Sequence, residues 1–240
     1  GFVAGGNAAL KILGRPPLIL DRSQGYIGVL IDDLVTKGTN EPYRMMTSRT
    51  EYRLLHRQDN ADQRLCPIGY QIGLVSRERY EAVQEKYRQV DREVSRLEHT
   101  GVAPGPALDA LLAAKGEPPA QNSQRLADLV RRPRLTYDDV APLDPDRPRL
   151  PRAVTEQVEI SLKYAGYIAR QQRQVEEMRR LEGRLLPEDL DYAALTGLRL
   201  EARQKLAALR PRSLGQASRI SGVSPADVAA LMIHLERQGE

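Results

Sequence analysis

The sequence has few of the residues that build disulfides, metal sites and aromatic cores. It contains one cysteine, no tryptophan and one phenylalanine in 240 residues. The single cysteine, Cys66, allows no internal disulfide and gives a zinc site too little sulfur. The histidines, at 56, 99 and 234, are not spaced as metal ligands. We therefore expect no metal site and a core of Leu, Ile, Val and Ala, which suits helices better than sheets.

Long apolar runs and targeting signals are also missing. No apolar run reaches the roughly 18 residues that a membrane-spanning helix needs, and no signal peptide is visible. We expect a cytoplasmic protein with no membrane contact. The chain opens on Gly1 rather than Met, in a stretch rich in Ala and Gly, and we expect it to be part of a larger protein.

Charged residues are plentiful, but the two signs nearly balance. The net charge is +4, and the 36 basic residues comprise 30 Arg and 6 Lys. The arginine excess has two interpretations: a GC-rich genome, or a need for bidentate contacts to phosphate. Because the net charge is small, any nucleic-acid surface must come from a local cluster of arginines.

The spacing of the apolar residues predicts a mainly α chain with two helical subdomains. Helices are expected over 2–13, 48–57, 61–72, 76–100, 107–114, 123–130, 155–183, 188–195, 199–209, 213–220 and 224–237. One short β-containing segment is expected near the N-terminus, at residues 26–31. Nine of the 16 prolines fall within 101–151, which predicts an irregular connector between the subdomains.

Motifs of catalysis and cofactor binding are absent from this sequence. It has no glycine-rich dinucleotide motif, no phosphate-binding P-loop, no zinc-protease motif and no serine nucleophile motif. Cys66 is followed by Pro67 and has no histidine nearby in sequence, so we do not expect it to be a nucleophile. We assign no catalytic, cofactor-binding or metal-binding residue.

A cluster of arginines lies on the predicted 48–57 helix, which begins with the S-x-x-E pattern of a capping box. Three arginines at intervals of four would share one face of that helix, and a fourth lies just upstream. The set is Arg44, Arg49, Arg53 and Arg57. Aligned cations favour an anionic partner such as RNA phosphate. The alternative is that Asp59, Asp62 or more distant acids pair with them.

The last two predicted helices form a hairpin that resembles a DNA-binding helix-turn-helix. The second helix, however, begins with small residues and Asp227, which cannot read base edges in a major groove. We therefore expect a packing unit or a protein-docking surface instead of DNA binding. The candidate partner contacts are Gln216, Arg219 and Met232. The alternative for Arg219 is an internal pair with Asp227 or a role in capping carbonyls.

Several separated motifs resemble one known family. They are EPYRM at 41–45, TSR at 47–49, EYRL at 51–54, DNAD at 59–62, EQVEI at 156–160, KY at 163–164, GYI at 166–168, RQ at 170–171 and GQASRI at 215–220. Together they resemble the C-terminal part of the glucose-inhibited division protein A family, the FAD-binding large subunit of the bacterial tRNA wobble-uridine modification enzyme. Met46, Thr50 and Cys66 depart from the family pattern, so Cys66 inherits no nucleophile role.

The resemblance implies an assembly and a reaction for the full-length protein. Members of the family form homodimers and work with a tRNA-modifying GTPase. They add a carboxymethylaminomethyl group to C5 of the wobble uridine with FAD, NADH and methylene-tetrahydrofolate. The glycine motif and catalytic cysteines of the family would precede Gly1. This chain would then be the region that contacts tRNA and the partner, and the four arginines would line a tRNA or active-site wall. A structural scaffold or protein-interaction module without RNA contact is the alternative.

Patterns and resemblance together divide the chain into four parts. Residues 1–20 would be the tail of a truncated FAD-binding domain, and 21–75 a connecting segment with the arginine-lined helix. Residues 76–150 would form the first helical subdomain with its proline-rich connector. Residues 151–240 would form the C-terminal helical subdomain.

The purified 240-residue chain should carry no flavin. Pyrophosphate binding needs a glycine-rich turn at a helix N-terminus, and this sequence has no such motif. The absorbance spectrum after gel filtration should therefore show no flavin band. A stoichiometric flavin band would contradict this expectation.

Overall fold

The structure is a computed structural model that describes residues 1–38 and 41–238. It is mainly helical, as the sequence predicts. The chain forms two compact units. Unit 1 comprises residues 1–56 and 170–240, and unit 2 comprises residues 57–169. No helix among the described residues is long and apolar enough to cross a membrane.

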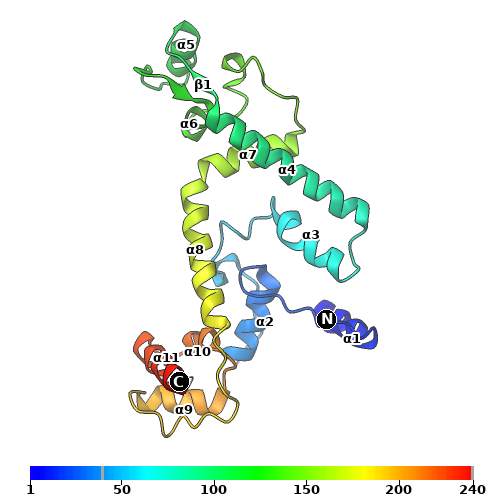
Figure 1. Cartoon of the computed structure of the whole chain (residues 1–240), viewed down its shortest axis with the longest axis vertical. Helices are drawn as coiled ribbons and strands as arrows, with labels where there is room; N and C mark the ends of the chain where they lie inside the picture. The colour runs from blue at the N-terminus through cyan, green and yellow to red at the C-terminus, as the bar shows by residue number, and fades with distance from the viewer. Residues whose placement is uncertain (39–40, 239–240) are drawn as a thin grey trace. The chain divides into compact units, whose positions relative to one another are not determined.

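Unit 2 contains the long helix α4 and the elements that pack around it (Figure 1). Its elements are α3 (Ala61–Gln71), α4 (Arg77–His99), β1 (Gly101–Val102), α5 (Pro106–Ala114), β2 (Gln124–Arg125), α6 (Leu126–Arg131), the 3-10 turn η2 (Ala141–Leu143) and α7 (Arg152–Lys163). The N-cap Ser76 accepts a hydrogen bond from the Arg79 amide at 3.3 Å, which fixes the start of α4. Strands β1 and β2 pair antiparallel, with Gly101 opposite Arg125.

The proline-rich stretch supplies much of the core of unit 2, which corrects its prediction as a mere connector. Its buried apolar side chains pack with those of α4 and α7; they are Leu108, Leu112, Leu126, Ala127, Leu129, Val130, Leu135, Tyr137 and Val140. Prolines punctuate this stretch without preventing short helices, because Pro106 occupies the first turn of α5, where no amide is needed. The number of prolines therefore led to the prediction of a connector, although the same stretch contains the leucines of the core.

A buried acid joins α4 to the segment after α6. The Glu93 carboxylate accepts hydrogen bonds from Arg96 and from the Tyr137 hydroxyl, the latter at 2.8 Å. Burial and this bond to Glu93 raise the pKa of Tyr137 to about 12. Arg96 also pairs with Asp144. These contacts satisfy a carboxylate that would otherwise be costly to bury.

The N-terminal part of unit 1 contains α1 (Phe2–Ile12) and α2 (Tyr26–Thr36). Helix α1 confirms its prediction, whereas the strand predicted at 26–31 is wrong. A short apolar run does not distinguish a strand from a buried helix, and here Val29, Asp33 and Thr36 share one buried face at helical spacing. Gly28 allows this helix to approach the preceding segment, since an added Cβ would lie 2.1 Å from the Asp21 carbonyl oxygen.

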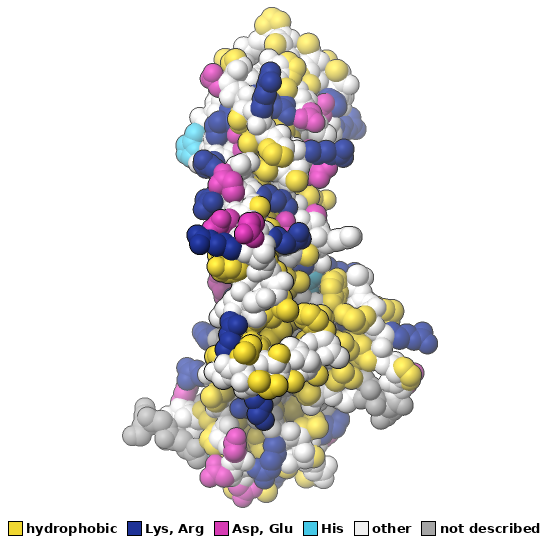
Figure 2. All heavy atoms as spheres, turned by 90° about the vertical axis from the view of Figure 1, so that its right-hand side faces the viewer, with side chains coloured by type: hydrophobic (Ala, Val, Ile, Leu, Met, Phe, Trp, Pro, Cys, Tyr) yellow, Lys and Arg dark blue, Asp and Glu magenta, His cyan; other side chains and the backbone are white. Residues whose placement is uncertain are grey.

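Large apolar side chains remain exposed on the first 46 residues. They are Phe2, Ile12, Leu13, Ile19, Ile27, Ile31, Leu34, Val35, Met45 and Met46. Figure 2 shows hydrophobic side chains at the surface of the part of the molecule that α1 and α2 form. Contiguous exposed apolar surface is a feature of sites that contact protein, membrane or ligand.

The C-terminal part of unit 1 is a small helical bundle. The one long helix predicted at 155–183 is two helices, α7 and α8 (Ala165–Glu182), which meet at Tyr164. The helix predicted at 188–195 is wrong, because this segment consists of turns. Helices α9 (Leu200–Leu209), α10 (Leu214–Arg219) and α11 (Pro225–Gln238) match the last three predicted helices. Their core includes Leu198, Leu206, Leu214 and Leu231.

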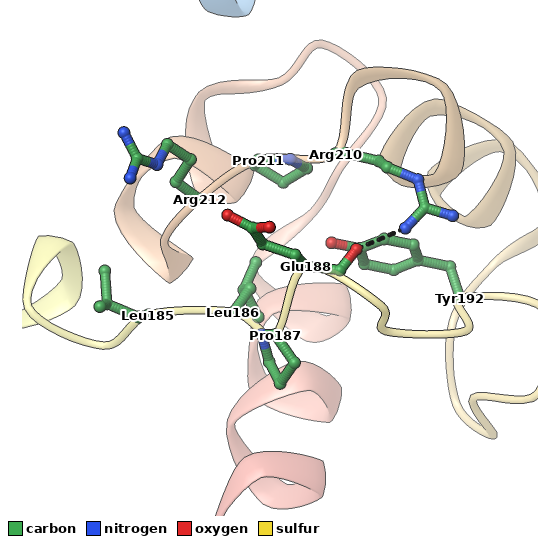
Figure 3. Close-up of a pocket in the computed structure, with 8 residues that line it drawn as sticks. All are labelled: Leu185, Leu186, Pro187, Glu188, Tyr192, Arg210, Pro211 and Arg212. Carbon is green, nitrogen blue, oxygen red and sulfur yellow. Dashed lines mark hydrogen bonds between the residues drawn. The ribbon is translucent and has the colours of Figure 1, made fainter.

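A cavity of about 570 Å³ opens in this bundle, between residues 185–188 and 210–212 (Figure 3). The two segments pair through their backbones: the Leu186 amide donates to the Arg212 carbonyl at 3.0 Å, and the Leu214 amide donates to the Arg184 carbonyl at 2.9 Å. Arg210 ends α9 with φ of 42°, the only non-glycine residue with positive φ among the described residues. Glycine is the usual residue in this conformation.

The core of unit 2 should be sensitive to loss of one leucine at its centre. Leu97 is fully buried, so Leu97→Ala should reduce the free energy of unfolding by about 2–5 kcal/mol. The exposed Leu74 is the matched control, and Leu74→Ala should cost under about 0.5 kcal/mol. Urea unfolding followed by circular dichroism measures both. Equal losses in the two variants would show that the packing around Leu97 is not as described.

Candidate RNA- and partner-contacting surface

The arginine-bearing segment is a folded loop and not a helix, which corrects the prediction for residues 48–57. Only a 3-10 turn, η1 (Thr47–Arg49), forms there. The Thr50 hydroxyl accepts a hydrogen bond from the Tyr52 amide at 3.2 Å and lies 3.0 Å from Nδ1 of His56. Such local bonds from a side chain to the backbone compete with helix formation. The predicted capping role of Glu51 is also wrong, because its carboxylate pairs with Arg22.

Buried contacts within unit 1 hold this loop in place. Nε2 of His56 is 2.8 Å from the Ser23 carbonyl oxygen, and the Tyr52 ring packs edge-on to the His56 ring. Gln171 of α8 bonds the loop twice: it accepts from the Leu54 amide at 3.1 Å and donates to the Glu51 carbonyl at 3.2 Å. The loop therefore has defined anchors on its inner side, and its outer side carries the arginines.

Three of the four predicted arginines are exposed on this loop: Arg44, Arg49 and Arg53. The Arg49 guanidinium lies over the Tyr43 ring, 4.7 Å from its centroid, and Tyr43 is itself held by a bond from its hydroxyl to Asp33 at 2.7 Å. Among the residues that the structure describes, no ion pair involves these three arginines. Their charge is therefore available to an anionic partner.

The fourth arginine, Arg57, lies differently. It belongs to unit 2, is partly buried, and pairs with Asp59 at 3.1 Å. The Asp59 carboxylate also accepts a bond from Gln157 at 2.8 Å, and the Arg57 carbonyl accepts one from Arg64. This is the internal pairing that the sequence left open as the alternative. Without the predicted helix, the four arginines do not form one stripe.

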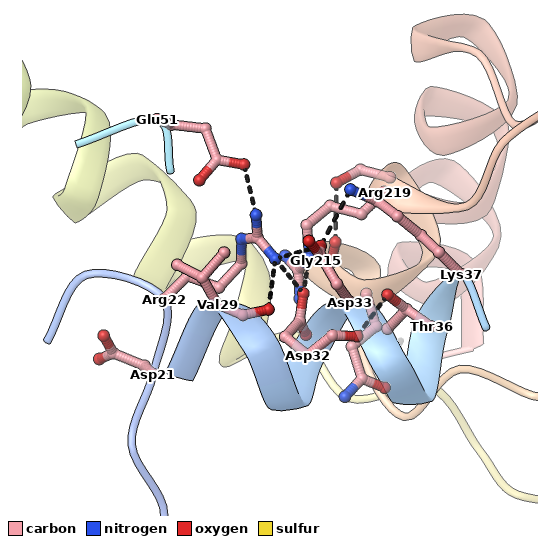
Figure 4. A network of polar contacts seen from close by, with 12 residues as sticks. Asp21, Arg22, Val29, Asp32, Asp33, Thr36, Lys37, Glu51, Gly215 and Arg219 are labelled. Atoms are coloured by element: carbon pink, nitrogen blue, oxygen red, sulfur yellow. Dashed lines mark hydrogen bonds and ion pairs between the residues drawn. The ribbon is translucent and has the colours of Figure 1, made fainter. Parts of the chain in front are cut away.

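A buried ion network links the loop to α2 and α10 (Figure 4). The Arg22 guanidinium, 3% exposed, pairs with Asp32 at 2.9 Å, Asp33 at 2.8 Å and Glu51 at 2.7 Å. Asp32 also pairs with Arg219 at 2.7 Å. Burial alone would oppose charge on these groups, but each charge has an opposite partner at hydrogen-bond distance. The sequence did not reveal this network, because its members are far apart along the chain.

The network determines the ionisation of Asp33. Burial opposes ionisation, but hydrogen bonds from Tyr43 and Arg22 outweigh it and lower the pKa of Asp33 to about 2. The pKa of Arg22 is raised: desolvation works against its charge, while Glu51 and Asp33 outweigh this effect. Arg22 and Asp33 are therefore both charged at neutral pH.

The three predicted partner contacts are partly buried and make contacts within unit 1. Arg219 is only 14% exposed and pairs with Asp32 and Glu182, so it is internally paired, although not with the acid that the sequence suggested. The Gln216 side chain accepts a bond from the Arg212 amide at 2.8 Å. Met232 packs against the bundle core. A partner could contact only the exposed fraction of these three side chains.

Asp227 pairs with Arg199 instead, at 2.8 Å, and accepts bonds from the Ser224 amide and hydroxyl. Burial opposes its ionisation, but the bonds from Arg199 and Ser224 lower its pKa. This acid therefore fixes the start of α11 from within. Its side chain is not available at that helix start to contact a nucleic acid.

Other reactive groups are sparse. Cys66 is buried in α3 and unpaired, and the described residues contain no group of His, Cys, Asp or Glu that could hold a metal ion.

Two family models match successive parts of this chain. The MnmG/GidA C-terminal helical domain of tRNA modifying enzymes matches residues 77–172, and the C-terminal helical bundle of the same enzymes matches residues 174–240. The chain belongs to the MnmG/GidA family. The boundary between the models falls in α8, close to the place where unit 2 ends and unit 1 resumes.

Relatives and solved structures agree with this family. The chain is 54% identical over 237 residues to the tRNA uridine 5-carboxymethylaminomethyl modification enzyme MnmG of Caldicellulosiruptor saccharolyticus, and 56% identical over 237 residues to that of Lachnoclostridium phytofermentans. These matches cover 99% of the chain but 38% of each relative. The form II crystal structure of Aquifex aeolicus GidA matches with a TM-score of 0.79 and 40% identity, covering 97% of this chain and 36% of that one.

Protonation of Asp33 should destabilise unit 1. Its pKa of about 2 lies below the roughly 3.9 of an unfolded aspartate. The stabilisation is therefore complete above about pH 4 and is lost as the pH falls through 2, and it amounts to about 2–3 kcal/mol. Asp33→Asn should lower stability at pH 7, and the difference from the parent chain should shrink between pH 4 and pH 2.

Urea unfolding at a series of pH values measures this effect. Asp189→Asn is the control, because Asp189 is an exposed acid in the same unit and surface substitutions usually change stability by under about 0.5 kcal/mol. A stability difference for Asp33→Asn that stays constant from pH 7 to pH 2 would contradict the assignment.

Proposed function

We propose that this chain is the tRNA- and partner-docking part of a FAD-dependent enzyme that adds a carboxymethylaminomethyl group to C5 of the tRNA wobble uridine. The observation that carries the proposal is the anchored loop with Arg44, Arg49 and Arg53 exposed and no acid of the described residues paired with them. The nearest acid in sequence, Glu51, is committed to Arg22. The choice of tRNA as the RNA, and of uridine modification as the reaction, is based on the names of the MnmG relatives.

The physical basis of docking is release of counterions from the RNA backbone. Arginine presents a fork of donors that matches phosphate oxygens, and each neutralised phosphate adds affinity that depends on salt. Three such side chains on a loop anchored by His56, Tyr52 and Gln171 would meet the RNA with little loss of conformational freedom. The loop supplies affinity and position, and the base chemistry lies elsewhere in the full-length enzyme.

The cofactors belong to the full-length enzyme and not to the residues described here. FAD, with NADH and methylene-tetrahydrofolate, would supply the redox and one-carbon chemistry. Residues 1–20 would be the tail of the FAD-binding domain, residues 21–75 the connecting segment, and residues 76–150 and 151–240 the helical subdomains. The exposed apolar side chains of α1 and α2 support this proposal, because they would be covered by the larger part of a full-length protein.

The proposed protein partners are inferred from membership of the MnmG/GidA family. They are a second copy of the full-length protein and a tRNA-modifying GTPase, in the cytoplasm. Docking of the GTPase through Gln216, Arg219 and Met232 remains a prediction, and the internal ion pairs of Arg219 weigh against it as a direct contact.

A structural scaffold without RNA contact is the second candidate, favoured by the internal pairing of Arg57 and Arg219. Salt-dependent tRNA binding distinguishes the two. Arg44, Arg49 and Arg53 together replaced by Gln should flatten the slope of log affinity against log salt by roughly 2, at about 0.7 per phosphate for single-stranded segments.

The matched control removes the same charge from α4. Arg77, Arg88 and Arg92 are exposed but already pair with glutamates of their own helix, so their replacement by Gln should leave the slope nearly unchanged. Electrophoretic shifts with unmodified tRNA at several salt concentrations measure both slopes. Equal slopes for the parent chain and the loop variant would support the scaffold.

A further inference from the structure

The cavity of the C-terminal bundle has the size and lining of a small-ligand site. Its volume of about 570 Å³ lies within the range of roughly 300–1,000 Å³ that is usual for ligand pockets. Its lining combines apolar walls with a few polar groups. It comprises Leu185, Leu186, Pro187, Glu188, Tyr192, Arg210, Pro211 and Arg212.

Most polar side chains of this lining have no partner among the described residues, and the exception is Arg210. Among the described residues, neither the Glu188 carboxylate nor the Arg212 guanidinium forms an ion pair, and both residues are exposed. The Tyr192 side chain is 2% exposed, and none of the hydrogen bonds of the bundle uses its hydroxyl. Figure 3 shows the Glu188 carboxylate between Arg212 on one side and Arg210 with Tyr192 on the other.

Arg210 is held so that its side chain faces this cavity. Its Nη1 donates to the Glu188 carbonyl at 2.7 Å, and the described residues of the bundle form no further hydrogen bond or ion pair with this guanidinium. Its backbone has a φ of 42°, where a side chain is disfavoured and glycine would be relaxed. A strained residue at a ligand clamp is a recurrent feature of binding sites.

The charges of the lining select the ligand class. Two arginines and one glutamate leave one net positive charge, which favours an anion. A bare phosphate would lie against the Glu188 carboxylate, which repels it. A guanine nucleotide resolves this conflict: its ring N1–H and 2-amino group donate side by side to one carboxylate, while its phosphate binds guanidinium groups. The flat base would lie against the apolar walls formed by the prolines and Leu186.

We propose that this cavity binds a guanine nucleotide, with Glu188 accepting from the base edge and Arg212 contacting phosphate, and that in the proposed function the nucleotide is an unpaired guanosine of the tRNA. Single-stranded RNA is commonly read in this way, through the hydrogen-bonding edges of splayed bases. The cavity would add base recognition to the backbone contacts of the arginine loop. The RNA assignment rests on the proposed function, whereas the base preference rests on the cavity.

Titration of the 240-residue chain with GMP, IMP and AMP, followed by calorimetry, tests the base preference. GMP should bind at least tenfold more tightly than AMP, about 1.4 kcal/mol. IMP, which lacks the 2-amino group, should bind between them. Glu188→Gln should weaken GMP binding at least tenfold and abolish the preference over AMP. Arg212→Gln should weaken all three nucleotides alike.

Controls come from α8, in the same unit. Glu176 and Arg173 are exposed there, and Glu176→Gln and Arg173→Gln should leave GMP binding unchanged. Circular dichroism verifies that each variant is folded. No GMP binding by the parent chain, or equal affinity for GMP and AMP, would overturn the proposal.

The tRNA-binding assay separates this inference from the proposed function. A chain that binds tRNA through the arginine loop but does not bind GMP refutes the cavity proposal alone. A chain that binds GMP selectively but does not bind tRNA refutes the RNA assignment and leaves a site for a free guanine nucleotide. Weaker tRNA binding by Glu188→Gln, at an unchanged salt slope, is the result expected if the guanosine belongs to the RNA.

Discussion

The buried guanidinium of Arg22 is the contact on which unit 1 depends. A charge withdrawn from water must be paired, and removal of one partner of such a pair costs about 3–5 kcal/mol. Arg22 finds its partners on α2 and on the arginine-bearing loop, and Asp32 extends the network to Arg219 of α10. Arg219 also pairs with Glu182 of α8. Three separated stretches of sequence are thereby joined by one charged cluster.

The arginines of this chain fall into two groups, those paired with acids and those without such a partner. Arg22, Arg96, Arg199 and Arg219 each pair with buried or partly buried acids and hold elements together. Arg44, Arg49 and Arg53 have no such partners among the described residues, partly because Glu51 is used by Arg22. Because Glu51 pairs with the buried Arg22, it does not neutralise the exposed arginines of the loop. The arginine excess of the sequence serves stability at some positions and, we propose, RNA binding at others.

Affinity and selectivity for a nucleic acid have different physical sources. Contacts to phosphate position an RNA but carry no sequence information, whereas contacts to base edges do. The loop of unit 1 offers donors suited to phosphate, and the cavity of the bundle adds a carboxylate acceptor and apolar walls. Hydrogen bonds hold both features in place: the loop through His56 and Gln171, and the cavity through paired backbone segments. A binding surface that is ordered beforehand loses less entropy on binding.

The sequence by itself determined the helical class, most helix positions and the family, since these depend on local periodicity, capping residues and contiguous motifs. The capped helix α4 and the last three helices were predictable for this reason. The strand at 26–31 and the helix at 48–57 were wrong, because Val29 and Asp33 are buried on one helical face and Thr50 bonds its own loop. Which arginine is exposed and which is paired was decided only by the tertiary structure. Asp32 and Arg219 are 187 residues apart, and no local pattern encodes a contact at that separation.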